Sequence, residues 1–362
     1  MPATGERTTP RVLWRVKVDR AREGRVVAEP AAPCAYRGRF APSPTGDLHL
    51  GSAAAALVAW VAARAAGGRL VLRIEDIDTP RVVAGMLERQ LEDLRWLGLD
   101  WDEGPDVGGP FAPYAQSARG DLYEAAIAAL ARRDLVYLCD CSRAEVARIA
   151  SAPHAGEEGP RYPGLCRAHG MRARSFKRPP AVRLRVPDGE VTVQDRFQGV
   201  LLQDVARTVG DFVLKRGDGI YSYQLAVVVD DLAMGITEAV RAIDLLDSAP
   251  RQVVLARLLG GEPPSFAHLP LVVAADGTRL AKRARGVPIR DQRAVGRTPG
   301  AVVAGVARVL GLSKGDEAEV APRELLEHLD LAALGSRKEV RLTGMLVDAL
   351  SDQEFENLPP RG

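Results

Sequence analysis

The sequence predicts an α/β fold that binds a ligand where its strands end. Two observations near the start of the chain support this fold. Residues 37–40 are extended and lead through a sharp turn into the apolar run 53–66, which has high helix propensity. Residues 69–74 then read as a second buried strand, and three carboxylates follow it. Because ligands of open α/β sheets bind at the carboxyl ends of the strands, we expect a binding site at this edge.

The turn between the first strand and the first helix predicts an anion site. Pro42 and Pro44 fix φ and keep the residues before them extended, and Gly46 allows the chain to reverse. His49 follows near the helix N-terminus, where free N–H groups and the helix dipole favour a phosphate. Taken alone, such a histidine is more often a cap or a surface residue, and the proline-rich surroundings favour the phosphate site. Ser52 stands where a Walker loop would have lysine, so we exclude a P-loop.

An acidic loop follows the second strand. Glu75, Asp76 and Asp78 lie directly after residues 69–74 and before Pro80. They could form a solvated loop that caps the next helix, or they could bind a ligand at the sheet edge. The residues alone leave both interpretations open.

Later segments alternate between helical and extended patterns. We expect helices at 87–97, 121–132, 298–310, 322–334 and 342–350, and strands at 181–186, 199–202 and 212–216. Thr298 and Pro299 supply the cap and the first residue of one of the C-terminal helices. Residues 1–36 contain one short alternating stretch, 12–18, and are either a flexible arm or the product of a wrongly assigned start.

Three of the four cysteines occur in a pattern that can bind zinc. The candidate ligands are Cys139, Cys141, Tyr162 and Cys166. Zinc prefers four such ligands in a tetrahedron, although tyrosine is uncommon and His154 or His169 could replace it. The alternative is three unrelated reduced thiols, and Cys34 is left over. Four cysteines in a cytoplasmic protein do not predict a disulfide framework.

Basic residues crowd the segment around and after the last of these cysteines. They are Arg161, Arg167, Arg172, Arg174, Lys177 and Arg178. A run of charges usually forms a solvated face, but a basic cluster beside a metal-held loop suits RNA phosphates. We therefore expect this segment to contact RNA.

Composition sets the broad class but not the partner. The chain has 362 residues, of which 46% are hydrophobic, so it can bury one large core and a small accessory domain. A net charge of +2 is too small to predict nucleic-acid binding, so RNA contacts must use local basic patches. There is no apolar run long enough for a membrane span and no apolar stretch beside the basic N-terminus. We expect a cytoplasmic monomer that does not contact membranes.

Residues 39–51, Arg-Phe-Ala-Pro-Ser-Pro-Thr-Gly-Asp-Leu-His-Leu-Gly, resemble the first signature of the class I aminoacyl-tRNA synthetases in the form used by the glutamyl group. Residues 73–78, 221–231 and 237–245 resemble further motifs of that group. Residues 276–283 resemble its second signature, Lys-Met-Ser-Lys-Ser. Arg279 replaces the first lysine, Ala281 replaces the small hydroxyl residue and Arg283 replaces the last serine. The second lysine, Lys282, is kept, and it is the one expected to meet the β- and γ-phosphates of ATP.

This resemblance implies a site that activates glutamate. It implies that His49 and Lys282 are catalytic and bind ATP together with Gly51, with Mg²⁺ on the phosphates. The implied glutamate-binding residues are Arg39, Phe40, Ala41, Pro42, Ser43, Glu75, Tyr223 and Arg241.

Within this set, Glu75 would hold the substrate ammonium group. Arg39 and Arg241 are candidates for binding the side-chain carboxylate, with Tyr223 as a hydrogen-bond donor. An ion pair of Arg241 with Glu238 or Asp244 is the alternative. The resemblance also implies a structural zinc ion on Cys139, Cys141, Tyr162 and Cys166.

The implied domains are an N-terminal extension at 1–36, two halves of a Rossmann-like catalytic domain at 37–138 and 181–297, a zinc-binding insertion at 139–180 and a small helical part at 298–362. There is no room for the anticodon-binding region of a glutamyl-tRNA synthetase. With the zinc pattern and the length, this makes the chain similar to the glutamyl-Q tRNA(Asp) synthetases, which attach glutamate to the queuosine base of tRNA(Asp). A compact glutamyl-tRNA synthetase that charges a 3′ end and a non-catalytic tRNA-binding relative are the alternatives.

Overall fold

The computed structural model describes residues 16–18, 26–28, 36–149, 161–273, 287–313, 317–327, 331–335 and 338–341. Several residues singled out above lie outside these ranges. They are the second-signature residues 276–283, including Lys282, together with Cys34, His154 and the predicted helix at 342–350.

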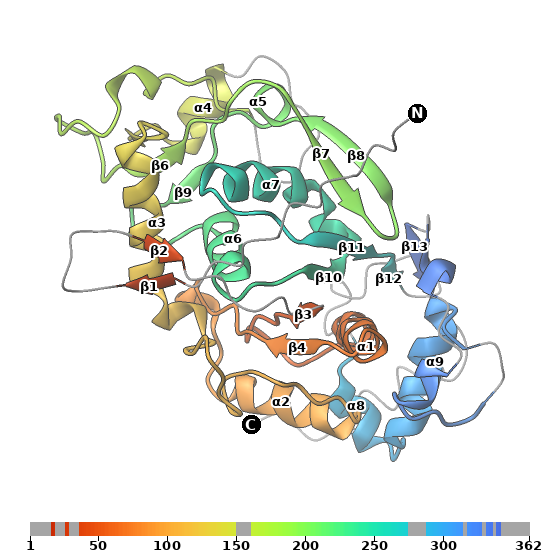
Figure 1. The fold of residues 1–362 in the computed structure, drawn as a ribbon. Coiled ribbons are helices and arrows are strands. Elements are labelled where there is room, and N and C mark those ends of the chain that lie inside the picture. Colours follow the sequence, from red (N-terminus) through yellow and green to blue (C-terminus); the bar gives the residue numbers. More distant parts are fainter. Residues whose placement is uncertain are drawn as a thin grey trace, which may run out of the picture.

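A six-stranded sheet lies at the centre of the fold (Figure 1). The strand order is β4 (Arg69–Leu72), β3 (Arg37–Phe40), β10 (Glu238–Ala242), β11 (Ser265–Leu269), β7 (Glu190–Asp195) and β8 (Gly199–Asp204). Neighbouring strands are parallel, except that β8 returns antiparallel to β7. The chain leaves β3 toward β4 on one side and later adds β10 on the other side. The carboxyl ends of β3 and β10 therefore form the switch point at which open α/β sheets bind ligands, as the sequence predicts.

Helix α1 (Leu50–Ala65) starts directly at this switch point and is largely buried. Leu50 and residues 53–63 are all buried, which explains why the sequence is apolar around the whole helix and not along one stripe. Strands β3, β4 and β10 contact it, and so do α9 (Pro299–Leu310) and a 3₁₀ turn at Glu324–Leu326. This packing fixes the N-terminus of α1 relative to the sheet.

The other helices surround the sheet. They are α2 (Met86–Trp96), α3 (Gly120–Arg132), α4 (Arg143–Ile149), α5 (Val205–Thr208), α6 (Tyr223–Ala233), α7 (Ala249–Leu258) and α8 (Ile289–Ala294). The predicted helices at 87–97, 121–132 and 298–310 are confirmed. At the start of α9, the Thr298 side chain accepts a hydrogen bond from the N–H of Ala301, as expected of an N-cap.

A smaller antiparallel sheet contains β5 (Val136–Cys139), β6 (Ala181–Leu184) and β9 (Val213–Lys215) and carries the cysteine-rich loop. Two further pairs are β1 (Val16–Val18) with β2 (Val26–Ala28), and β12 (Leu271–Val273) with β13 (Glu339–Arg341). Short 3₁₀ segments lie at Thr79–Arg81, Gln116–Ala118, Arg167–His169 and Ile243–Ser248. The predicted strands at 181–186, 199–202 and 212–216 are confirmed.

The prediction of one helix at 322–334 is wrong. The described residues form 3₁₀ turns at Glu324–Leu326 and Leu331–Leu334. Leu325 and Leu334 are both buried in the core that surrounds α1. In an α-helix, residues nine apart point to opposite faces, so one helix could not bury both side chains against that core.

Among the described residues, no helix combines the length and the apolarity needed to cross a membrane.

Candidate active site

His49 caps α1 at the turn that the sequence predicts as an anion site. Its Nδ1 accepts a hydrogen bond from the backbone N–H of Ser52 at 3.2 Å, so a neutral ring carries its proton on Nε2, which lies 3.1 Å from the hydroxyl of Ser52. Burial lowers the pKa of His49, with a smaller opposing effect of Asp244, and this keeps the imidazole neutral. A neutral donor beside a helix N-terminus can bind a phosphate oxygen without needing to lose or gain a proton.

Two further features enclose the His49 turn. A Cβ at Gly51 would lie 3.1 Å from atoms of the His49 ring, so glycine is what lets the ring lie against the start of the helix. The N–H of Leu50 donates to the carbonyl of Val287 at 3.0 Å, and Ile289 donates to Leu48 at 2.8 Å. The chain that follows the second signature is therefore paired with the turn that carries the first.

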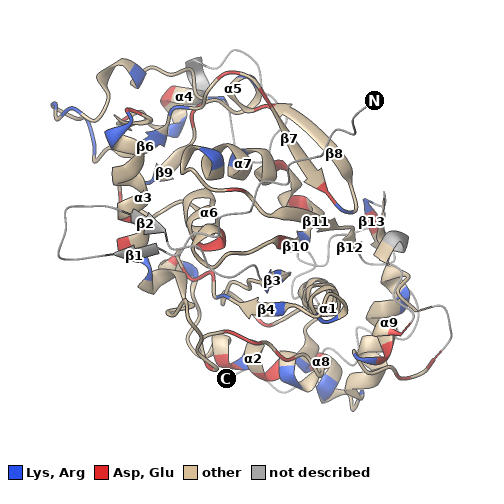
Figure 2. Cartoon of the chain, in the orientation of Figure 1, with Lys and Arg blue, Asp and Glu red and all other residues tan. Residues whose placement is uncertain are grey.

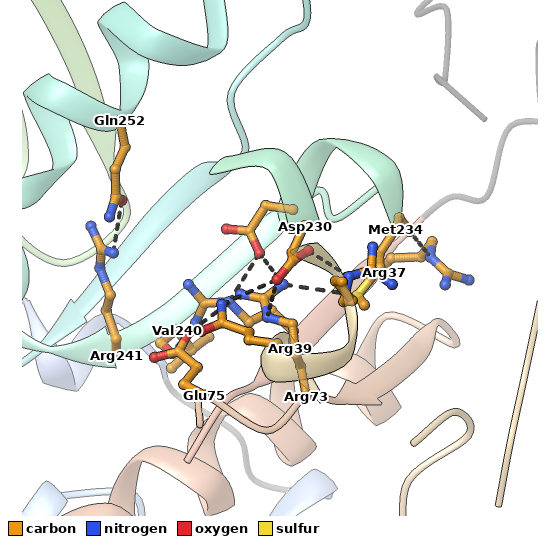
Figure 3. A network of polar contacts seen from close by, with 12 residues as sticks. Arg37, Arg39, Arg73, Glu75, Asp230, Met234, Val240, Arg241 and Gln252 are labelled. Atoms are coloured by element: carbon orange, nitrogen blue, oxygen red, sulfur yellow. Dashed lines mark hydrogen bonds and ion pairs between the residues drawn. The ribbon is translucent and has the colours of Figure 1, made fainter. Parts of the chain in front are cut away.

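A buried network of ion pairs lies beside this turn and joins the two ends of the catalytic fold (Figure 3). Asp231 of α6 accepts hydrogen bonds from Nη1 of Arg73 at 2.7 Å and from Nε of Arg39 at 3.3 Å. Nη2 of Arg73 lies 3.5 Å from Glu75. Burial opposes the charge of Arg73, but Asp231, Asp230 and Glu75 outweigh burial and raise its pKa. The network thus holds Arg39 and Glu75 close to one another.

The acidic loop divides between this network and local structure. Glu75 joins the network, and its backbone N–H donates to the carbonyl of Pro42 at 2.9 Å, which links it to the first signature. Burial raises the pKa of Glu75, with Arg73 and Arg39 opposing. Asp76 instead accepts hydrogen bonds from the N–H and the hydroxyl of Ser117.

Arg241 of β10 is buried and is held by three neutral side chains. Its Nε donates to Nε2 of His268 at 2.8 Å, and its Nη1 donates to Oε1 of Gln252 at 2.8 Å and to the hydroxyl of Tyr223 at 3.4 Å. Its Nη2 is buried and has no hydrogen-bond partner within the described ranges. Figure 3 shows Arg241 and Gln252 pointing toward each other.

No carboxylate of the described residues forms an ion pair with Arg241, so the alternative of a pair with Glu238 or Asp244 is not realised. Glu238 is instead paired with Arg196 at 3.1 Å. Burial lowers the pKa of Arg241. A buried guanidinium with an unused N–H group and no anion is costly unless a ligand supplies the anion.

The sequence did not point to His268, Asp195 and Gln252. The parallel register places His268 of β11 directly beside Arg241, and Nδ1 of His268 lies 2.5 Å from Asp195 at the end of β7. Gln252 comes from α7. The only available signal was that Asp195 and His268 lie near the carboxyl ends of apolar segments, where parallel strands meet a ligand.

The remaining residues expected around glutamate are the short stretch 40–43 and Tyr223. The side chain of Phe40 is buried in the core, so this residue can reach a ligand only through its backbone. Ala41 and Pro42 follow, and Ser43 is exposed at the turn, with its carbonyl accepting from Nε2 of Gln90 at 3.1 Å. Tyr223 is half-buried at the first turn of α6.

The cysteine-rich loop brings the four predicted metal ligands together. The Sγ atoms of Cys139, Cys141 and Cys166 lie within 4.8 Å of one another. The hydroxyl of Tyr162 lies 3.3 Å from the sulfur of Cys139 and 3.7 Å from that of Cys141, and it accepts the N–H of Cys166 at 2.9 Å. Burial raises the pKa of the Cys141 thiol to about 12 in the absence of a metal. Three sulfurs and one phenol oxygen in one buried cluster fit a tetrahedral zinc ion, which would hold the thiols as thiolates.

Most of the basic residues near this cluster are already paired within the chain. Arg174 pairs with Asp140 at 2.6 Å, Arg167 with Asp211 at 3.2 Å, Lys177 with Glu145 at 3.2 Å and Arg178 with Glu145 at 3.5 Å. Arg161 donates to the carbonyl of Ala206, and only Arg172 of the six has a side chain without a partner in the described part of the chain. These pairs link the cysteine-rich loop to neighbouring parts of the chain, and contact with RNA stays a prediction.

Opposite charges also join α2 to α8, and Figure 2 marks acidic and basic positions along the α2 ribbon and basic positions on the α8 ribbon. Arg293 donates to the buried Asp93 at 3.1 Å and to Glu92 at 3.2 Å, and Arg290 donates to Glu92 at 2.7 Å. Arg290 also approaches Asp47 of the first-signature turn at 3.8 Å. These contacts anchor the first helix after the second signature to the first half of the fold.

Comparisons with known proteins agree with this architecture. Residues 35–340 match the family of class I tRNA synthetases (E and Q), catalytic domain. The glutamyl-Q tRNA(Asp) synthetase of Symbiobacterium thermophilum is 50% identical over 319 residues, which are 87% of this chain and 98% of that protein. The one of Nitratidesulfovibrio vulgaris is 47% identical over 83% of this chain and 94% of its own length.

Among solved structures, a glutamate tRNA ligase from Elizabethkingia meningosepticum, crystallised in complex with its amino acid, superposes with a TM-score of 0.73. It is 28% identical, and the match covers 90% of this chain and 70% of that one. The chain therefore belongs to the class I tRNA synthetases for glutamate and glutamine, and within them to the glutamyl-Q tRNA(Asp) synthetases.

Proposed function

We propose that the chain activates L-glutamate with ATP and transfers it to the queuosine base in the anticodon of tRNA(Asp). The names of its relatives supply the acceptor, and the catalytic family supplies the use of ATP. The observation in the structure that supports glutamate best is Arg241, a buried guanidinium without an anionic partner among the described residues. The side-chain carboxylate of glutamate would supply the missing charge.

The other groups of glutamate have matching partners nearby. Glu75 would accept the ammonium group, and Arg39 lies beside it in the same ion-pair network. Tyr223 accepts a hydrogen bond from Arg241 through its oxygen, so its own O–H can donate to the substrate. The first-signature backbone at residues 40–43 would border the same pocket.

In the activation step, an oxygen of the glutamate α-carboxylate attacks the α-phosphorus of ATP and the bond to the β-phosphate breaks. The products are glutamyl-adenylate and pyrophosphate. The chain contributes position and charge, as is usual for attack at phosphorus. The Nε2–H of His49, which faces the Ser52 hydroxyl, would donate to a phosphate oxygen instead when ATP binds. Lys282, together with Mg²⁺, would neutralise the leaving pyrophosphate. In the second step, a hydroxyl of the queuosine ring attacks the activated carbonyl and releases AMP.

Zinc would be held by Cys139, Cys141, Tyr162 and Cys166, and its role would be structural. With four protein ligands, a tetrahedral zinc ion would have no position left for a substrate. The ion would fix the loop that follows β5. We propose that this loop, with Arg172, lies along the tRNA.

The test is transfer of radiolabelled glutamate with ATP to four RNAs: tRNA(Asp) with queuosine, the same tRNA with guanosine in its place, queuosine-containing tRNA(Asp) without its 3′-terminal adenosine, and tRNA(Glu). We expect label on both queuosine-containing RNAs and none on the others. Label on tRNA(Glu) that depends on an intact 3′ end would instead identify a compact glutamyl-tRNA synthetase. If no RNA is labelled and no pyrophosphate exchange occurs, the chain is a tRNA-binding relative without this activity.

A further inference from the structure

We propose that His268, held by Asp195, is a positioning residue that keeps Arg241 oriented for a substrate carboxylate and so sets the preference for glutamate over glutamine. This inference rests on the proposed function, because it concerns the same amino-acid pocket. Neither residue touches the substrate in this proposal. Both act through the guanidinium of Arg241.

The first step of the argument is the state of the imidazole. Asp195 has one carboxylate oxygen, Oδ1, that accepts the N–H groups of Phe197 at 3.0 Å and Gln198 at 2.9 Å. Its other oxygen, Oδ2, faces Nδ1 of His268 at 2.5 Å. A carboxylate in this position requires the imidazole proton on Nδ1, which leaves the lone pair on Nε2. Burial lowers the pKa of His268, in agreement with a neutral ring.

The second step is what this lone pair does to Arg241. Nε2 of His268 accepts the Nε–H of Arg241 at 2.8 Å. If the ring had its proton on Nε2 instead, two N–H groups would face each other and the contact would be repulsive. The fixed tautomer therefore makes His268 a hydrogen-bond acceptor for the cation Arg241. This role is uncommon for histidine, because its side chain can itself become a cation. His268 and Arg241 are both buried, so neither can turn to water instead.

The third step is the set of groups that remain free for a ligand. With Nε on His268 and Nη1 on Gln252, the guanidinium of Arg241 has only Nη2 unused. Gln252 gives its oxygen to Arg241, so its Nε2 is a donor, and this atom is also buried without a partner among the described residues. The hydroxyl of Tyr223 accepts from Arg241 and has its proton to donate.

All three available groups are therefore hydrogen-bond donors. A carboxylate has only hydrogen-bond acceptors, and it carries the negative charge that would balance the positive charge of Arg241. The side-chain amide of glutamine would place its own NH₂ against these donors and would bring no charge. Polar mismatches of this kind give strong discrimination, because buried donors are left unpaired. The discrimination requires that Arg241 cannot rotate, and the Asp195–His268 pair is what prevents rotation.

The test compares two substitutions at the same position. His268→Gln keeps an acceptor oxygen near the place of Nε2, whereas His268→Leu has a similar size and no acceptor. We would measure glutamate-dependent ATP–pyrophosphate exchange, with and without tRNA, as KM for glutamate, KM for ATP, and the ratio of kcat/KM for glutamate to that for glutamine. Val193→Ala is the matched control, because Val193 is buried on the same strand as Asp195 and has no contact with Arg241 among those described.

For His268→Leu we expect KM for glutamate to rise by about 10-fold or more, KM for ATP to change by less than about 3-fold, and the preference over glutamine to fall by about 10-fold or more. His268→Gln should recover most of both losses. Val193→Ala should lower only the unfolding temperature. If His268→Leu keeps the wild-type KM and preference, or if the glutamine variant behaves like the leucine variant, the inference is overturned.

Asp195→Asn gives a second test that does not depend on the leucine variant folding. The backbone N–H groups hold the amide oxygen at the Oδ1 position, so the NH₂ would face the imidazole and force its proton onto Nε2. We expect about a 10-fold loss in kcat/KM for glutamate with His268, and less than about 3-fold when position 268 is glutamine. Equal losses in both backgrounds would overturn the inference. A wild type without glutamate-dependent exchange would instead disprove the proposed function itself.

Discussion

At the scale of single residues, burial affects both ends of the proposed glutamate site. It raises the pKa of Glu75, against the opposing effects of Arg73 and Arg39, and it lowers the pKa of Arg241. Each shift disfavours the charged form that the substrate needs, and a bound substrate would counteract it by bringing the opposite charge. Because arginine stays protonated at any working pH, the pH dependence of glutamate binding should come from Glu75.

We predict that kcat/KM for glutamate falls as the pH is lowered from about 7 to 5, with little change in KM for ATP. Glu75 has a pKa above its ordinary value of 4.5, so it takes up a proton at a higher pH than an exposed carboxylate and then no longer attracts the ammonium group. Pyrophosphate exchange at closely spaced pH values measures this. Glu75→Gln should lower kcat/KM for glutamate by about 10-fold or more, and this value should not change with pH. A wild-type profile that is equally flat would argue against this role of Glu75.

At the scale of elements, the predicted metal ligands connect the loop after β5 to the small sheet. Cys139 ends β5, and Tyr162 and Cys166 return to it from a later segment. Arg183 of β6 lies over the ring of Tyr162, with 3.9 Å from its guanidinium carbon to the ring centre. The ligand cluster thus joins the loop to the small sheet, so loss of the metal should disturb the loop while leaving the catalytic fold intact.

We predict that Cys166→Ser binds less than about half of the zinc bound by the wild type, because a structural site needs all four ligands. Transfer of glutamate to tRNA should fall about 10-fold or more, while pyrophosphate exchange stays within about 3-fold, since activation does not involve the loop. Zinc content after gel filtration and the two activity assays measure these effects. Cys34→Ser is the matched control and should leave zinc and both activities unchanged.

The contact between α2 and α8 is a second feature at this scale. Asp93 is fully buried, burial raises its pKa, and Arg293 is its nearest cation. We predict that Arg293→Met lowers the free energy of unfolding by about 1–3 kcal/mol, because it leaves a buried carboxylate without its best partner. Asp93→Asn in the same chain should recover part of this loss. Urea unfolding of the two single variants and the double variant measures the coupling, and additive effects would show that the pair is not coupled.

At the scale of the whole molecule, buried charges join segments that are far apart in the sequence. Asp230 of α6 accepts from Nε of Arg119 at 2.6 Å, and its neighbour Asp231 accepts from Arg73 and Arg39. Arg37 forms a second buried pair with Glu103, with both nitrogen–oxygen distances at 2.8 Å. Removing one partner of such a network leaves the others buried in an apolar environment without a counter-charge.

We predict that Arg73→Met lowers the free energy of unfolding by about 3–5 kcal/mol, because two buried carboxylates lose a shared cation. Arg69→Met, at the start of the strand that ends just before Arg73, removes an arginine whose side chain is 56% exposed and should cost less than about 1 kcal/mol. Chemical unfolding of both variants measures the difference. Similar losses for the two variants would show that burial of Arg73 is not what makes it important.

The sequence predicted the parts of the fold that are set by local signals. The strand, turn and helix at residues 37–65 and the cap at Thr298 depend on residue types at short spacing, and these are found as expected. Cys139, Cys141 and Cys166 also cluster as their spacing predicts, and metal binding there stays a prediction. Asp195 and His268 could not be found in this way, since only the register of three parallel strands brings them to Arg241. The pairing of most basic residues near Cys166 could not be predicted for the same reason, because their acidic partners come from other parts of the chain, and contact with RNA stays a prediction.

The network around Asp231 has a consequence for attempts to redesign this enzyme. Arg39 has two tasks, since it borders the proposed pocket and neutralises a carboxylate of the core. Replacing it to accept an uncharged amino acid would leave Asp231 with one cation in place of two. A library that varies the pocket alone would therefore be enriched in unfolded chains, and new specificities should emerge only from variants that change Arg39 and Asp231 together.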